Sequence, residues 1–219
     1  MTLNKSNNVA PIFAISRFRM GIDGNGITTL VTFMGCPLTC KYCPNKICHD
    51  VYDTNTMNGN NNKIMYLTPQ ELYDMVKRDN IYFQSTGGGI CFGGGEPTLY
   101  ADFIQEFRKI CGGKWAITLE TSLVCSNSTI KQLSNIVDHW IVDIKSLDPY
   151  IYKNYTNQTS AIRETLKILQ ETIPNDRVTI KVPYIPGYND INSIYSDILQ
   201  IKTLYGYTNV HKVEYKIIE

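Results

Sequence analysis

The sequence lacks several features that would assign the chain to large classes of protein. No segment is long and apolar enough to span a membrane, and the first eight residues, MTLNKSNN, lack the apolar run of a secretory signal. Neither sign of charge is in surplus, since 21 basic residues balance 20 acidic ones, so neither nucleic acid nor an anionic membrane is indicated as a partner. We therefore expect a cytoplasmic globular protein, with a flexible tail at residues 1–8 and a single domain at 9–219.

Histidine is scarce, and cysteines at ligand spacing occur at one place only. The seven cysteines are an odd number in a chain expected to be cytoplasmic, so a disulfide framework is not indicated. Cys36, Cys40 and Cys43 form a C-x3-C-x2-C motif, and the sequence holds no second C-x2-C pair. This motif is the strongest sign of chemistry in the chain.

Short apolar runs rich in β-branched and aromatic residues alternate with helical patterns along the chain. This alternation predicts parallel strands joined by helical crossovers. About six strand–helix units are too few for a closed eight-unit barrel, which needs roughly 250 residues, so we expect an α/β fold: an open partial (β/α)6 barrel with helices outside. The expected strands are 27–33, 89–92, 115–120, 140–145, 177–185 and 212–218, and the expected helices are 68–78, 100–111, 128–137, 160–172 and 190–205.

Unusual polar and glycine-rich features follow or end these strands. In barrels of parallel strands, reactive residues gather at the carboxyl ends of the strands. The sequence therefore predicts that these features meet in one site. In chain order they are Cys36, the GGGEP segment at 93–97, Glu120 with Thr121, Asp143 with Lys145, and Lys181.

The three clustered thiols are compatible with two metal centres. A structural zinc site would be closed by four ligands, and Cys48 or His49 could supply the fourth. A [4Fe–4S] cluster usually takes four cysteines, and with three it leaves one iron open to an outside ligand. An open coordination position is typical of a catalytic site, so the spacing favours the cluster without excluding zinc.

The cysteine motif and several further stretches of the sequence resemble those of a known enzyme family. CPLTCKYC at 36–43 resembles the cluster motif of the radical S-adenosylmethionine (radical SAM) enzymes, and GGGEP at 93–97 resembles their SAM-binding segment. The stretches at 20–36, 85–99, 138–156 and 180–190 resemble the glycyl-radical-enzyme activating enzymes. Within that family the chain is similar to the pyruvate formate-lyase activase type. Residues 44–66 hold only Cys48, so we expect the form with a single cluster.

The cysteine and glycine motifs carry the cofactor roles that the resemblance implies. Cys36, Cys40 and Cys43 would hold the [4Fe–4S] cluster, whose open iron would bind the amino and carboxylate groups of SAM. Tyr42 would lie against the adenine. The residues expected at the methionine amino group are Gly93, Gly94, Gly95 and Glu96.

Charged residues at later strands carry the other implied roles. Asp143 and Lys145 would lie near the SAM carboxylate and ribose, and Glu120 and Thr121 would join Asp143 in binding a monovalent cation, Na⁺ or K⁺. Glu120 stands where the family has aspartate. Lys181 stands where it has arginine, which keeps the charge but not the bidentate fork. The implied catalytic residues are Asp23, near the substrate backbone, Lys145, and Lys181, which would also contact SAM.

The function implied by the resemblance is reductive cleavage of SAM to a 5′-deoxyadenosyl radical that abstracts a hydrogen from a glycine Cα. The expected partners of this monomer are a glycyl radical enzyme and a flavodoxin- or ferredoxin-type electron donor. Alternatives within the superfamily are a 7-carboxy-7-deazaguanine synthase-like enzyme, a ribonucleotide reductase activase and a peptide-modifying enzyme. The alternative from another class is a non-catalytic zinc-binding scaffold.

Overall fold

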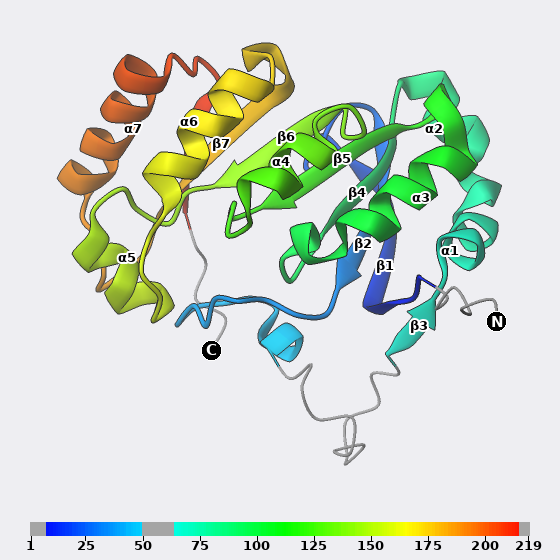
Figure 1. Cartoon of the computed structure of the whole chain (residues 1–219), viewed down its shortest axis with the longest axis horizontal. Coiled ribbons are helices and arrows are strands. Elements are labelled where there is room, and N and C mark those ends of the chain that lie inside the picture. The colour runs from blue at the N-terminus through cyan, green and yellow to red at the C-terminus, as the bar shows by residue number, and fades with distance from the viewer. Residues whose placement is uncertain (1–7, 50–63, 215–219) are drawn as a thin grey trace, which may run out of the picture.

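The computed structural model describes residues 8–49 and 64–214, which form an open eight-stranded sheet flanked by helices (Figure 1). The tail expected at 1–8 lies almost wholly outside the described residues. Within the described ranges, no helix is long and apolar enough to cross a bilayer. The strands run in the order β3-β1-β2-β4-β5-β6-β7-β8.

Six neighbouring strands are parallel, as the sequence predicts. The strand order confirms the expected partial (β/α)6 architecture, because β8 and β3 form the two ends of an open sheet. The last strand lies earlier than expected, and the end of the predicted range 212–218 lies outside the described residues. The parallel strands are β2 (Ile27–Phe33), β4 (Gly89–Gly94), β5 (Ala116–Thr121), β6 (His139–Asp143), β7 (Val178–Tyr184) and β8 (Val210–Glu214).

Two strands extend the sheet beyond the prediction. β1 (Ala10–Met20) pairs antiparallel with β2, and β3 (Met65–Leu67) pairs antiparallel with β1. The turn between β1 and β2 contains three glycines with positive φ, at 21, 24 and 26. This backbone conformation suits glycine because it has no Cβ.

Four of the helices begin at a residue whose side chain accepts from their first amide groups: α1 (Pro69–Val76), α4 (Asn127–Leu133), α5 (Pro149–Thr156) and α7 (Ile191–Tyr205). The Thr68 hydroxyl accepts from the amide of Glu71, and the Glu71 carboxylate accepts from the amide of Thr68, so the predicted capping box is present. Two helices were not predicted: α2 (Asn80–Thr86) and α5. The predicted ones are α1, α3 (Ala101–Cys111), α4, α6 (Ile162–Thr172) and α7.

The core lies between the sheet and the helices that cover one of its faces. Figure 1 shows α3, α4 and α6 over that face. Phe33 on β2 stacks on Phe92 of β4 and meets the edge of Phe103 of α3, and all three side chains are buried. Burial of these rings holds the two strands in place, and their carboxyl ends enter the site described next.

Candidate active site

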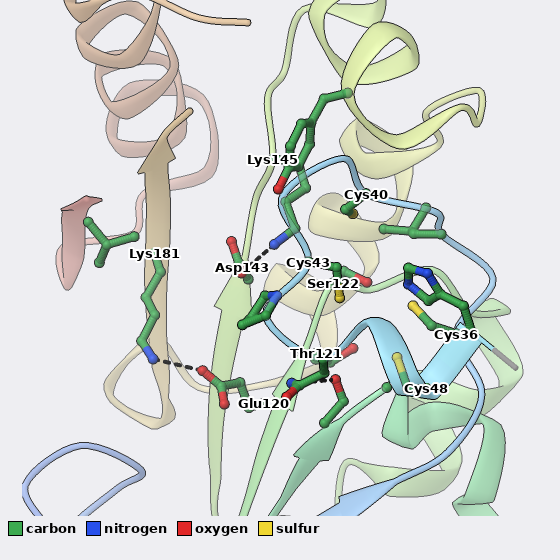
Figure 2. A pocket seen from close by; sticks show the side chains of 18 residues that line it. Cys36, Cys40, Cys43, Cys48, Glu120, Thr121, Ser122, Asp143, Lys145 and Lys181 are labelled. Carbon is green, nitrogen blue, oxygen red and sulfur yellow. Dashed lines mark hydrogen bonds and ion pairs between the residues drawn. The ribbon is translucent and has the colours of Figure 1, made fainter. Parts of the chain in front are cut away.

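A cavity of about 320 Å³ lies at the carboxyl ends of the parallel strands (Figure 2). Its size is within the range of small-molecule sites. Figure 2 shows the cysteines on one side and the Lys181–Glu120 pair on the other. The predicted site residues that line it are Cys36, Cys40, Cys43, Gly94, Gly95, Glu120, Thr121, Asp143, Lys145 and Lys181. Asp23, Tyr42, Gly93 and Glu96 are not among the lining residues.

The segment that carries the cysteines is held at both ends by backbone hydrogen bonds. Near β2, the Glu96 amide donates to the Gly35 carbonyl at 2.7 Å. Further along, the amides of Thr39 and Lys41 donate to the carbonyls of Thr156 and Tyr155, at 3.2 and 3.1 Å. Figure 1 shows this segment running from β2 along one end of the molecule towards α5. Helix α5 therefore positions the loop from Cys36 to Cys43, a role that the sequence did not reveal.

Two glycines at the end of β4, Gly94 and the following Gly95, allow close approach of neighbouring chain segments. A Cβ on Gly95 would lie 2.1 Å from the Gly35 carbonyl oxygen, and one on Gly94 would lie 2.6 Å from the Cβ of Thr32. Gly94 also has φ +91°, which disfavours other residues. Glycine is required here to seat the cysteine loop on the end of β4, and it also leaves the carbonyl of Gly94 to accept from the Asn45 amide group.

The thiols make a soft donor set suited to iron or zinc. Burial raises the pKa of Cys36 to about 12 and that of Cys40 to about 11, so a cation must displace protons that the buried thiols otherwise hold. A hydrogen bond from Cys48 lowers the pKa of Cys43. The ligand atoms of Cys43, Cys48 and His49 lie within 4.8 Å of one another. The thiols suit a metal centre by their chemistry, and Cys48 and His49 lie beside Cys43 as the zinc alternative required. Cys36 and Cys40 line the same cavity but do not belong to that close group.

Two lysine–carboxylate pairs also line the cavity, and only the Lys181–Glu120 pair lies on the side away from the cysteines. Lys145 donates to Asp143 at 2.5 Å, and Lys181 donates to Glu120 at 2.8 Å (Figure 2). Burial lowers the pKa of Lys181, but the Glu120 carboxylate outweighs it, and the net pKa lies above its usual value. Paired ammonium and carboxylate groups can bind a zwitterion by exchanging partners, and the aminoacyl end of an amino-acid derivative carries both charges.

Glu96 is fully buried, and its carboxylate accepts hydrogen bonds from neighbouring residues of the protein. One oxygen accepts from the Thr98 amide and hydroxyl and from the Thr121 hydroxyl, and the other accepts from the Ser122 amide and hydroxyl, all at 2.6–3.2 Å. These bonds join the segment after β4 to the end of β5. Glu96 thus shapes the wall of the site, and its expected bond to the SAM amino group stays a prediction.

Asp23 and Tyr42 lie outside the cavity wall. Asp23 is buried and forms an ion pair with Arg19. The ring of Tyr42 packs edge-on against Tyr188, with 5.9 Å between ring centroids, and Tyr188 packs in the same way on Tyr155. Sequence reasoning missed Tyr155 as a site residue, although it belongs to the Tyr-Thr pair in the stretch at 138–156.

The fold is a partial barrel of parallel strands, and the cavity at the carboxyl ends of these strands is lined by thiols and by charged side chains. The sequence matches the Radical SAM superfamily over residues 30–195, and the chain belongs to that superfamily. Its members use a [4Fe–4S] cluster and SAM, which favours the cluster over the zinc alternative.

Individual relatives are similar over much of the chain. The 4-hydroxyphenylacetate decarboxylase activating enzyme of Clostridioides difficile is 28% identical over 242 aligned residues, covering 86% of this chain and 76% of the relative. The pyruvate formate-lyase-activating enzyme of Clostridium pasteurianum is 33% identical over 63% of this chain and 53% of the relative. Among solved structures, Streptococcus suis SuiB bound to its precursor peptide SuiA has a TM-score of 0.59 at 14% identity, covering 85% of this chain and 38% of SuiB, which shows the fold alone.

Proposed function

We propose that this chain is the activating enzyme of a glycyl radical enzyme. It would cleave SAM reductively to methionine and a 5′-deoxyadenosyl radical, which takes a hydrogen atom from a glycine Cα of the partner and leaves as 5′-deoxyadenosine. The observation that carries the proposal is one cavity that is lined by the thiols of Cys36, Cys40 and Cys43 and by two lysine–carboxylate pairs. Relatives named as activating enzymes of decarboxylases and of pyruvate formate-lyase support the choice of partner.

In this proposal the residues of the chain bind and orient the reactants. Cys36, Cys40 and Cys43 hold the cluster, which when bound supplies one electron for cleavage of the sulfur–carbon bond of SAM. The Lys145 ammonium attracts the SAM carboxylate, and the Asp143 carboxylate that it faces would lie near the SAM ribose, whose hydroxyl groups can donate to it. The backbone at Gly94 and Gly95 lets the ligand approach the end of β4.

The expected monovalent cation would compete with a lysine. Glu120 and Asp143 each face an ammonium group, and the Thr121 hydroxyl donates to Glu96. We propose that a cation, if bound, enters beside Glu120 only when Lys181 turns to another partner. Adding K⁺ or Na⁺ should therefore change the affinity for SAM more in Lys181→Met than in the unaltered protein. An equal cation effect in both proteins would contradict this competition.

Anaerobic reconstitution tests the reaction. The protein is purified without oxygen, loaded with iron and sulfide, reduced and given SAM, and 5′-deoxyadenosine is measured. Cys40→Ala should lose the cluster absorbance and the product, whereas Cys111→Ala, which changes a buried cysteine outside the cavity, should keep both. An unaltered protein that holds a cluster but never cleaves SAM would overturn the proposal.

A second assay tests the partner. The reduced protein and SAM are incubated with a candidate glycyl radical enzyme, and the glycyl radical is sought by electron paramagnetic resonance (EPR). A radical signal that needs both SAM and the intact cysteine motif supports the activating role. Cleavage of SAM with no radical in any glycyl radical enzyme of the host would leave a radical SAM enzyme with another substrate. The electron donor, flavodoxin- or ferredoxin-type, stays a prediction, as do the monomeric state and the cytoplasmic location.

A further inference from the structure

Tyr155 lines the cavity, and its hydroxyl is buried without a hydrogen-bond partner among the described residues. The side chain is 1% exposed. Burying a hydroxyl without a partner costs about 1–3 kcal/mol, so such groups in native proteins call for an explanation. At the edge of a ligand cavity, the explanation we favour is a partner that arrives with the ligand.

Tyr155 lies close to the Lys145 ammonium group and to the thiols of Cys40 and Cys43. The phenol interacts electrostatically with Lys145, Cys40, Asp143 and Cys43, and Lys145 is the strongest of these four. Burial raises the pKa of Tyr155, so the phenol stays protonated and is available as a donor. A donor hydroxyl beside an ammonium group is an arrangement that favours an anionic oxygen.

The Tyr155 ring is held in place from two directions. The ring packs edge-on against the ring of Tyr188, with 5.4 Å between the ring centroids and an interplanar angle of 67°. The carbonyl of Tyr155 accepts from the Lys41 amide, inside the cysteine loop. The hydroxyl therefore has a fixed position relative to the loop that carries Cys40 and Cys43, which is what a positioning contact requires.

We propose that the Tyr155 hydroxyl donates a hydrogen bond to the carboxylate of SAM, next to the Lys145 ammonium. The inference rests on the proposed binding of SAM in this cavity and adds a residue that fixes its aminoacyl end. It does not depend on the partner protein, because SAM binding precedes any encounter with a glycine.

Tyr155→Phe tests the contact, and Tyr207→Phe is the matched control. Tyr207 also has a buried hydroxyl without a partner in the described structure, but it lies between α7 and β8 and does not line the cavity. SAM affinity is measured on the reconstituted protein from the change in the EPR spectrum of the reduced cluster. We expect roughly tenfold weaker SAM binding in Tyr155→Phe and no change in Tyr207→Phe. Both variants should keep the iron content of the unaltered protein.

Decarboxylated SAM separates the carboxylate from the rest of the ligand. It should bind the unaltered protein and Tyr155→Phe with equal affinity, because the acceptor is gone from the ligand. The proposal is overturned if Tyr155→Phe leaves the affinity for SAM unchanged, or if it weakens both ligands equally. A shifted reduction potential of the SAM-free cluster with unchanged SAM affinity would place the hydrogen bond on a cysteine sulfur instead. If no glycyl radical forms while the affinity difference holds, only the activating role fails.

Discussion

Replacing Glu96 by glutamine should destabilise the fold, although the side chain keeps its size. The carboxylate accepts five hydrogen bonds through two oxygens and is fully buried. Glutamine offers one oxygen and an NH₂ group. If the oxygen keeps Thr98 and Thr121, the NH₂ group faces the Ser122 amide, which is then a donor without an acceptor.

The magnitude follows from these contacts. One orphaned amide costs about 1–3 kcal/mol, and the remaining bonds weaken when the acceptor loses its charge. Relief from burying a charge offsets part of the loss, so we expect about 2–4 kcal/mol. In a chain of this length, 1 kcal/mol corresponds to roughly 2–4 °C in melting temperature, so the transition of Glu96→Gln should fall by roughly 5–15 °C.

Thermal unfolding followed by circular dichroism on the cluster-free protein measures this effect. Glu106→Gln is the control, because Glu106 is 48% exposed and pairs with Lys109 on the surface of α3; its transition should move little. If Glu96→Gln melts with the unaltered protein but loses SAM binding, Glu96 does not support the structure as argued and acts directly on the ligand.

Three further predictions concern the glycine segment, a histidine and the second lysine. Gly95→Ala should cut the iron and sulfide content after reconstitution to less than half, since its Cβ would collide with the Gly35 carbonyl; Gly113→Ala, with open space around it, should not. Burial lowers the pKa of His139, so the imidazole of the unfolded chain is protonated before that of the folded protein as the pH falls, and the stability of the fold should drop below about pH 6.5. His139→Gln should flatten that part of the plot of stability against pH, and an unchanged plot would contradict the reasoning. Lys181→Met should weaken SAM binding roughly tenfold with iron content unchanged, and loss of the cluster instead would show that Lys181 supports the metal centre.

The parallel half of the fold could be predicted because each strand carries its own local signal. Runs such as 27–33 are apolar and β-branched, and helices with caps such as Thr68 separate them. β1 was missed because Pro11, Arg17 and Arg19 interrupt its apolar pattern, and its place in the sheet depends on pairing with β2.

Part of the candidate site could likewise be predicted from the sequence, and part could not. The carboxyl-end rule brought together Cys36, Glu120 and Lys145, because strand direction alone decides which end a residue occupies. The direction of Glu96 could not be predicted, because it depends on hydroxyl groups supplied 25 and 26 residues later. Helix α5 was missed because tyrosine and asparagine are modest helix formers, although Asp148 before Pro149 is a helix-start signal that could have revealed it.

The hydrogen bonds between the cysteine loop and α5 set an order of events during synthesis. The partners of Thr39 and Lys41 are 117 and 114 positions later in the chain, at Thr156 and Tyr155. The loop cannot take its final shape until those residues have left the ribosome and α5 has docked. Insertion of the cluster therefore follows folding of the first seven-tenths of the chain, and a nascent chain stalled before residue 155 should fail to retain iron even though all three cysteines are already exposed to it.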